Sequence, residues 1–228
     1  MIRILTPPYK IFPLSDSSIT IDFGAVIDVG INTIVAQLFD YSNSHPFIGF
    51  IEAVPAYASL TIFYNVLQVR EANPSANTAY AVIENYLITS LKALTSTETK
   101  EPALIEIPVV YDGEDLAFVA EHNQLSIEEV IQIHTQATYR VFMMGFLPGF
   151  AYLGGMDERI STPRKSTPRT KVPSGSVGIA GKQTGIYPLE SPGGWQLIGR
   201  TSLPLFDSNS SNPTLLKAGD LVRFIEVK

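Results

Sequence analysis

Cysteine is absent from the 228-residue sequence, and so is any long hydrophobic run. The absence of cysteine excludes disulfide bonds and thiolate metal sites, and it fits a reducing compartment. No run approaches the roughly 18 uninterrupted apolar residues that a membrane span requires, and the opening MIRILTPPYK lacks the apolar segment of a secretory signal. We therefore expect a cytoplasmic protein that does not bind a membrane.

Histidine is scarce as well, with three residues in the chain. His45, His122 and His134 have no partner at HxxxH or HxH spacing, so each is interpreted as a surface or structural histidine rather than a metal ligand. The GxSxG motif that presents a serine nucleophile is also missing. The sequence predicts no metal site, and the catalytic residues stay unassigned.

The segment GSVGIAGKQ, which begins at Gly175, has some features of a phosphate-binding P-loop. A P-loop has four residues between its first glycine and the Gly-Lys pair, and a Ser or Thr follows the lysine. Here five residues separate Gly175 from Gly181, and Gln183 follows Lys182. The segment is interpreted as a strand with a glycine turn, so the chain carries no nucleotide motif.

The net charge of −6 is unevenly distributed. Residues 1–139 carry five basic and 16 acidic groups, whereas residues 140–228 carry 11 basic and six acidic groups. Two interpretations stay open at this point. The halves are either two domains with differently solvated surfaces, or the C-terminal half meets an anion or an acidic partner surface.

Strand and helix signals alternate in the first hundred residues. Period-two spacing of Ile19, Ile21 and Phe23 predicts a half-buried strand. Asp28 is placed to cap a helix that ends at the NSHP segment. The segments FIGFIEAV and SLTIFYNV predict two more strands, and Asn73-Pro74 is expected to start a second helix with an apolar stripe that runs to Leu94.

A polar break near residues 95–102 predicts a boundary between a domain at 1–98 and a domain at 99–228. Two short helices follow in DLAFVAEHNQLSIEEVIQIHT, with Ser126 and Glu129 spaced as a capping box. This stretch superficially resembles a helix-turn-helix, but it contains no Lys or Arg, so nucleic-acid binding is not expected. After Tyr139, short apolar runs between glycines and prolines predict a barrel or a compact β-domain.

The segment GFLPGFAYLGG, residues 145–155, combines four glycines and a proline with large apolar side chains. It contains Phe146, Pro148, Phe150 and Tyr152. We interpret it as a stiff aromatic loop at the mouth of the barrel, whose rings meet a partner or a small substrate. The alternative is a buried β-bulge loop.

Basic residues gather between Arg159 and Ser176, where five of them occur without an acidic residue. Arg164 and Arg169 stand in repeated TPR contexts and are candidates for bidentate contacts to a carboxylate or phosphate, whereas the alternative is a solvated loop. Further on, the only tryptophan, Trp195, lies beside Gln196 and near Arg200. An exposed indole there would bind a ligand, and a buried one would fill the barrel.

Three segments together closely resemble the family of the 5-oxoprolinase B subunit, which also includes the allophanate hydrolase subunit 1 domain and the KipI histidine-kinase inhibitor. They are GFLPGFAYLGG, EHNQLSIEEVIQIHT and STPRKSTPRTKVPSGSVGIAGKQTGIYPLESPGGWQLIGRT. The likeness spans nearly the whole chain. It departs at SDSSITIDFG, where the family usually has a glycine-aspartate opening before an apolar strand.

The resemblance implies an α+β fold, with a small α/β N-terminal domain followed by a cyclophilin-like β-barrel domain. It implies a non-autonomous enzyme subunit that works with subunits A and C and with ATP to convert 5-oxoproline, a small lactam, to glutamate. Two alternatives are a KipI-like inhibitor that binds a sensor histidine kinase and a prolyl isomerase, the latter suggested by barrel shape alone. The candidate substrate- or partner-binding residues are Phe146, Pro148, Phe150, Tyr152, Arg164, Arg169, Gln183, Tyr187, Trp195 and Arg200.

Overall fold

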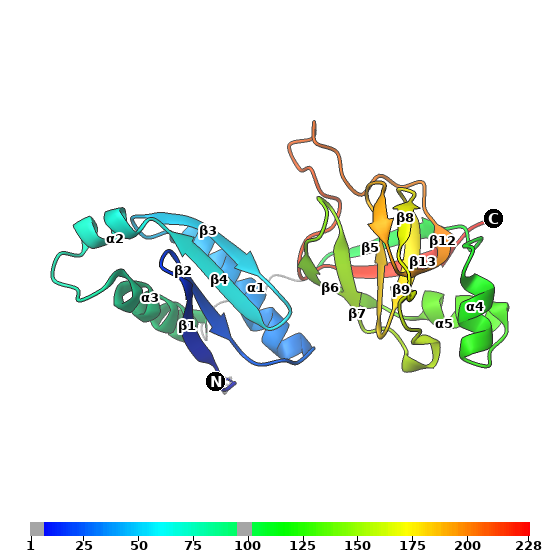
Figure 1. Ribbon diagram of the computed structural model, residues 1–228, viewed down its shortest axis with the longest axis horizontal. Helices are drawn as coiled ribbons and strands as arrows, with labels where there is room; N and C mark the ends of the chain where they lie inside the picture. The colour runs from blue at the N-terminus through cyan, green and yellow to red at the C-terminus, as the bar shows by residue number, and fades with distance from the viewer. Residues whose placement is uncertain (1–6, 95–101) are drawn as a thin grey trace. The chain divides into compact units, whose positions relative to one another are not determined.

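The computed structural model describes residues 7–94 and 102–228 (Figure 1). Internal contacts divide the chain into two compact units, Met1–Glu101 and Pro102–Lys228. The boundary expected between residues 98 and 99 lies outside the described residues. Each unit has its own buried hydrophobic cluster.

The first unit is an antiparallel sheet in the order β1-β2-β4-β3, packed against helices. Its strands are β1 (Lys10–Ser15), β2 (Ser18–Asp22), β3 (Phe50–Pro55) and β4 (Ser59–Tyr64). Its helices are α1 (Val29–Ser44), α2 (Val66–Ala72) and α3 (Ala79–Ala93). Helices α1 and α3 contact each other, while α1 packs on β3 and β4 and α3 packs on β2. The core therefore lies between one face of the sheet and this helix pair.

Local sequence signals explain most of this unit. Ile19 and Ile21 are fully buried on β2, as period-two spacing predicts, but Thr20 between them is buried too, so the strand is buried on both faces and is not half-buried. The Asp28 side chain accepts a hydrogen bond from the Ile31 N–H and caps α1, which ends at Ser44 within the predicted stop segment. The predicted strand FIGFIEAV is shorter than expected, because β3 begins only at Phe50.

The predicted start of the second helix at Asn73 is wrong. Asn73 instead ends the short helix α2, since its N–H and its side-chain amide both donate to the Val69 carbonyl. Helix α3 begins at Ala79 after an N-cap at Thr78. The start of α2 is not recognisable in SLTIFYNV, because β4 ends at Tyr64 and the next residue, Asn65, already caps the helix.

The second unit is built around a seven-stranded sheet in the order β12-β9-β10-β7-β6-β13-β5. Its strands are β5 (Leu104–Val109), β6 (Tyr139–Met144), β7 (Ala151–Gly154), β9 (Ser176–Ala180), β10 (Gln183–Ile186), β12 (Gln196–Arg200) and β13 (Leu221–Glu226). A two-stranded sheet pairs β8 (Arg169–Val172) with β11 (Ser191–Gly193). The remaining elements are α4 (Leu116–His122), α5 (Ile127–Gln136) and the short 3-10 helix η2 (Glu158–Ile160).

Contacts between its two edges nearly close this sheet. Val110, which follows edge strand β5, and Arg200, at the end of edge strand β12, exchange two backbone hydrogen bonds of 2.9 Å. All neighbouring strands are antiparallel except the parallel pair β5–β13. Helix α5 packs on β13 and α4 packs on β12. The predicted α+β class with a barrel-like second unit is therefore confirmed.

Several predictions for this unit can be compared with single elements. Ser126 and Glu129 form the predicted capping box at the start of α5. The segment GSVGIAGKQ forms the hairpin β9–β10, with Gly181 at a φ of 58° in the turn. One of the short apolar runs after Tyr139, LPLF at residues 203–206, forms no strand and makes one isolated bridge, between Phe206 and Thr214. Within the described ranges, none of the helices has both the length and the apolar character needed to cross a bilayer.

Candidate functional site

Five rings from three segments of the sequence pack into one group, which we call the aromatic cluster: Phe146, Phe150, Tyr152, Tyr187 and Trp195. Phe150 is its centre, because its ring lies edge-on to Tyr152 at 4.9 Å between centroids and to Tyr187 and Trp195 at 5.5 Å each. Edge-to-face contacts of this kind add to the stabilisation that comes from burial.

The turn before β7 positions this centre. The Phe150 N–H donates to the Leu147 carbonyl, and the Gly145 N–H donates to the Phe150 carbonyl. Gly149 has a φ of 81°, which suits glycine, but Phe146 has a φ of 71°, which is strained for a side chain of its size. Gly193 contributes from another segment, since a Cβ there would collide with the Tyr187 hydroxyl.

Burial divides the aromatic cluster into two parts. Phe150, Tyr187 and Trp195 are only 1%, 1% and 5% exposed, so they form core and cannot contact a partner directly. Phe146 is 60% exposed, and Tyr152 is half-buried. Within the segment GFLPGFAYLGG, Phe150 is buried in the core, whereas Phe146 and Pro148 are exposed to solvent. Contact of the exposed rings with a partner or a substrate stays a prediction.

Arg169 is held by acidic residues of the same chain. Its Nη2 donates to both carboxylate oxygens of Asp115 at 2.7 and 2.6 Å, and its Nε pairs with Glu114 at 2.7 Å. Asp115 is buried and also accepts from Lys165 Nζ and from the Leu197 N–H. The prediction that Arg169 binds an external carboxylate or phosphate is therefore corrected, because its guanidinium is already engaged on two sides.

Arg164 behaves differently from Arg169. Its side chain is exposed and lies 5.9 Å from the centroid of the Trp195 ring, a cation–π distance. It makes no ion pair with any residue in the described ranges. Burial raises the pKa of the nearby Tyr187 hydroxyl above its usual value, while a backbone hydrogen bond at Trp195 and the charges of Arg164 and Arg169 oppose that rise.

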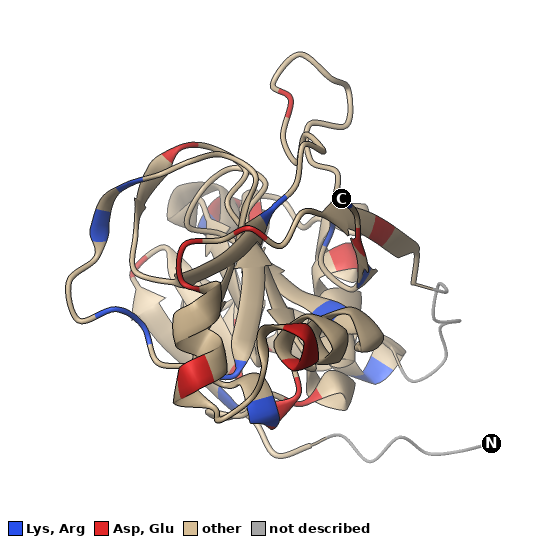
Figure 2. Cartoon of the chain, turned by 90° about the vertical axis from the view of Figure 1, so that its right-hand side faces the viewer, with Lys and Arg blue, Asp and Glu red and all other residues tan. Residues whose placement is uncertain are grey.

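Residues 163–168 form a segment that we call the basic loop, and three hydrogen bonds tie it and Arg169 to Gly194–Gln196. The Lys165 N–H donates to the Gly194 carbonyl at 2.8 Å, and Gln196 Nε2 donates to the Pro163 carbonyl at 2.8 Å. Arg169 Nη1 donates to the Trp195 carbonyl at 3.2 Å. The basic loop is therefore held in place before any ligand arrives, which favours binding. Figure 2 marks the basic and acidic residues along the chain.

A cavity of about 300 Å³ opens between the basic loop, α4 and β12. It is lined by Phe118, Pro163, Arg164, Lys165, Ser166, Thr167 and Gln196. Two cations, two hydroxyls and an amide thus face one concave surface, which suits a small anion that also forms hydrogen bonds. This cavity is the candidate functional site.

Of the ten residues proposed from sequence, Arg164 alone lines this cavity, and three others lie outside the aromatic cluster as well as outside the basic loop and Arg169. Arg200 is exposed at the seam of the barrel, where it pairs with Asp112 at 2.8 Å. Gln183 is half-buried in the hairpin β9–β10, opposite Ala180, and Pro148 is exposed in the turn before β7. None of them lines the cavity.

Sequence reasoning proposed none of the other lining residues, and two residues that shape the site come from a segment far from the basic loop in the sequence. Asp115 reads as an ordinary acid before a helix, and no local signal shows that its partner is Arg169, 54 residues later. Phe118 on α4 reads as an amphipathic helix residue, yet it is 47% exposed and lines the cavity. An exposed phenylalanine on a helix was the one available signal.

The histidines do not contribute to this site. His134 is fully buried between Tyr111 and Thr184, with Nδ1 at 2.7 Å from the tyrosine oxygen and Nε2 at 3.0 Å from the threonine oxygen. Burial lowers the pKa of His134 to about 3, so the ring is neutral, and its role is structural. The described part of the chain contains no group of three or more potential metal-binding side chains.

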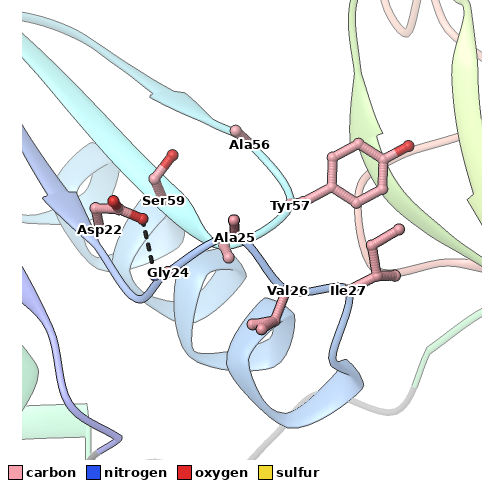
Figure 3. Close-up of a pocket in the computed structure, with 9 residues that line it drawn as sticks. Asp22, Gly24, Ala25, Val26, Ile27, Ala56, Tyr57 and Ser59 are labelled. Carbon is pink, nitrogen blue, oxygen red and sulfur yellow. Dashed lines mark hydrogen bonds between the residues drawn. The ribbon is translucent and has the colours of Figure 1, made fainter.

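A second cavity, of about 310 Å³, lies in the first unit between the end of β2 and the β3–β4 turn (Figure 3). Its polar side chains include Asp22, whose carboxylate already accepts from the Gly24 N–H at 2.9 Å, and Ser59. Val26 and Ile27 are exposed beside it. No lysine or arginine is among the lining residues, so this cavity does not suit an anion.

Comparison with known proteins gives a consistent family assignment. The family model described as "Carboxyltransferase domain, subdomain C and D" matches residues 9–216. The 5-oxoprolinase B subunit of Bacillus subtilis is 47% identical, over 98% of this chain and 95% of that protein. The protein of the same name from Escherichia coli O157:H7 is 48% identical, over 70% of this chain and 79% of that protein.

Two solved structures share the fold of this chain. The crystal structure of TTHA0988 is 36% identical with a TM-score of 0.79, and the match covers 92% of this chain and 40% of that longer chain. The Kluyveromyces lactis urea carboxylase matches with a TM-score of 0.74 over 98% of this chain and 22% of its own length. At 20% identity, that second likeness shows a shared fold and nothing further.

Proposed function

Since the chain belongs to the family of 5-oxoprolinase B subunits and carries the carboxyltransferase domain, subdomain C and D, we propose that it is the B subunit of an ATP-dependent 5-oxoprolinase. The observation that carries this proposal is 47% identity to the Bacillus subtilis protein over nearly the full length of both chains. The histidine-kinase inhibitor considered from sequence is not favoured, because the relatives at 47–60% identity are all named as the B subunit of 5-oxoprolinase.

The proposed reaction opens the lactam ring of 5-oxoproline to give glutamate. A lactam is an unreactive amide, and phosphorylation of its carbonyl oxygen by ATP supplies a leaving group, which departs as phosphate after one water molecule adds to the activated carbon and the C–N bond breaks. The complex therefore needs ATP and a site that excludes bulk water but admits this one molecule. In this chain the glycine-rich stretch that most resembles a phosphate loop forms the hairpin β9–β10. We therefore assign no step of ATP chemistry to this chain and propose that subunits A and C complete the site.

Reconstitution tests the proposal. We expect the purified chain alone to release no glutamate from 5-oxoproline, and ATP-dependent glutamate release to begin only when cognate subunits A and C are added. The matched control is the A and C mixture without this chain, which should be inactive. Full activity of the chain by itself would refute the shared site. A complete mixture that is inactive but inhibits autophosphorylation of a sensor histidine kinase would instead identify an inhibitor.

A further inference from the structure

The size of the cavity beside the basic loop restricts its ligand. Its volume is about 300 Å³. Small-molecule sites occupy roughly 300–1,000 Å³, so this one accommodates a single small metabolite rather than a peptide or a nucleotide. Phe118 and Pro163 supply apolar contact area beside the polar groups, which suits a compact ring.

Charge gives the cavity a preference for an anion. Lys165 pairs with Asp115, and the neighbouring Arg169 pairs with Asp115 and Glu114, whereas Arg164 lines the cavity without an ion pair among the described residues. Lys165 and Arg169 are engaged by these carboxylates, so the uncompensated positive charge is that of Arg164. A guanidinium that keeps its hydrogen-bond donors available binds a planar carboxylate in a two-pronged geometry.

Gln196 adds a buried hydrogen-bond acceptor to the cavity. It lines the cavity and is only 3% exposed. The Pro163 carbonyl can only accept a hydrogen bond, so the amide nitrogen of Gln196 must face it, at 2.8 Å. The amide oxygen Oε1 is then left without a partner among the described residues. A buried acceptor without a donor is unfavourable. Oε1 has almost no accessible surface, so a ligand N–H or O–H removes that penalty when the cavity lining moves to admit it.

The hydroxyls of Ser166 and Thr167 complete the polar lining. Both residues are exposed on the basic loop, and neither hydroxyl makes a hydrogen bond within the described part of the chain. Hydroxyls can donate to a carboxylate or to a carbonyl oxygen. The cavity thus offers several donors and a cation for an anion, and one buried acceptor for a donor.

We propose that this cavity binds a small cyclic carboxylate that carries an N–H donor, which is the chemistry of 5-oxoproline itself. Arg164 holds the carboxylate, Gln196 Oε1 accepts the lactam N–H, and Phe118 packs beside the ring. This inference rests on the proposed function for the identity of the substrate. It goes further by locating the substrate in this chain and naming the residues that select it.

Direct binding to the purified chain, measured by calorimetry and by the fluorescence of the sole tryptophan, tests the proposal with four probes. They are 5-oxoproline, its lactone analogue 5-oxotetrahydrofuran-2-carboxylate, 2-pyrrolidinone and inorganic phosphate. We expect 5-oxoproline to bind best. The lactone lacks only the N–H and should bind about 3- to 10-fold more weakly, and pyrrolidinone, which lacks the carboxylate, should bind at least about 10-fold more weakly. Tighter binding of phosphate than of 5-oxoproline would overturn the proposal.

Variants show whether the named residues make these contacts. Arg164→Gln should weaken 5-oxoproline binding by about 10-fold or more, whereas Arg159→Gln, an exposed arginine paired with Asp157, should leave it unchanged. Gln196→Met should abolish the difference between 5-oxoproline and the lactone. If the preference for the N–H survives in Gln196→Met, or if the two arginine variants behave alike, the assignment is wrong. Because Arg164 is exposed, its variant stays informative even where Gln196→Met does not fold.

The reconstituted complex separates this inference from the proposed function. If the wild-type complex turns over and Arg164→Gln raises KM for 5-oxoproline by about the factor seen in binding, both stand. Turnover with an unchanged KM in Arg164→Gln and no binding to the chain alone would overturn the site but keep the function. An inactive complex, together with 5-oxoproline binding to the chain that depends on Arg164, would overturn the proposed function but keep the site.

Discussion

Asp115 is the residue on which the basic loop depends, because a single buried carboxylate organises Arg169, Lys165 and the Leu197 N–H. A buried ion pair contributes modest net stability, but removal of one partner leaves a charge uncompensated. We expect Asp115→Ala to lower the free energy of unfolding by about 3–5 kcal/mol in urea titrations. The control Asp112→Ala removes an exposed acid paired with Arg200 and should change it by less than about 1 kcal/mol. Equal effects of the two variants would show that the Asp115 network is dispensable.

His134 makes stability depend on pH. Its pKa is lowered to about 3 by burial, from 6.5 in the unfolded chain, so between these values only the unfolded chain binds a proton. Its contribution is complete above pH 6.5 and decreases as the pH falls, by up to about 1.4 kcal/mol per pH unit. We expect the stability difference between wild type and His134→Gln to shrink from pH 7 to pH 5 in urea titrations. A difference that stays constant from pH 7 to pH 5 would contradict a neutral buried ring.

At the scale of elements, the turn before β7 combines a core anchor with an exposed ring. Phe150 is 1% exposed, so Phe150→Ala should cost about 3–5 kcal/mol of unfolding free energy. Phe146 is 60% exposed and has a positive φ, so Phe146→Ala should change stability by no more than about 0.5 kcal/mol. Thermal and urea unfolding of the two variants measure this directly. Similar losses of unfolding free energy in the two variants would mean that the burial of these rings does not determine what they contribute to stability.

Helix α4 and strand β12 each contribute one side chain to the lining of the candidate site. Phe118 comes from α4, Gln196 starts β12, and the basic loop is hydrogen-bonded to the turn before β12. Two tightly packed glycines allow this arrangement. Gly113 packs against the backbone at Ile198, and Gly199 packs against the Val110 carbonyl, where a side chain would collide. The backbone before α4 can therefore approach β12 closely enough for Asp115 to meet the Leu197 N–H.

At the scale of the whole molecule, the chain consists of two units with separate cores. The second unit contains the aromatic cluster, the basic loop and the cavity, all within Pro102–Lys228. We expect a fragment of residues 102–228 to fold alone, with dispersed NMR amide signals and cooperative unfolding. It should also keep the preference for 5-oxoproline over pyrrolidinone. A disordered fragment would show that the first unit is needed for folding.

Local spacing alone determined many of the elements. Asp28 as a cap, the Ser126–Glu129 capping box and the buried face of β2 follow from residues within four positions of one another, so the sequence predicts them correctly. The barrel-like second unit also followed from the density of short apolar runs between glycines and prolines, together with the family resemblance.

Only the tertiary structure decided which side chains are exposed and which are buried or held in ion pairs. Arg164 and Arg169 stand in the same TPR context, yet one is exposed over Trp195 and the other is bound by Asp115, 54 residues away. In the same way, Phe146 and Phe150 lie in one short segment, and packing against Tyr187 and Trp195 buries only the second completely. Helix and strand signals depend on near neighbours, whereas burial and ion pairing depend on which distant segments meet when the sheet closes, and no local pattern carries that information.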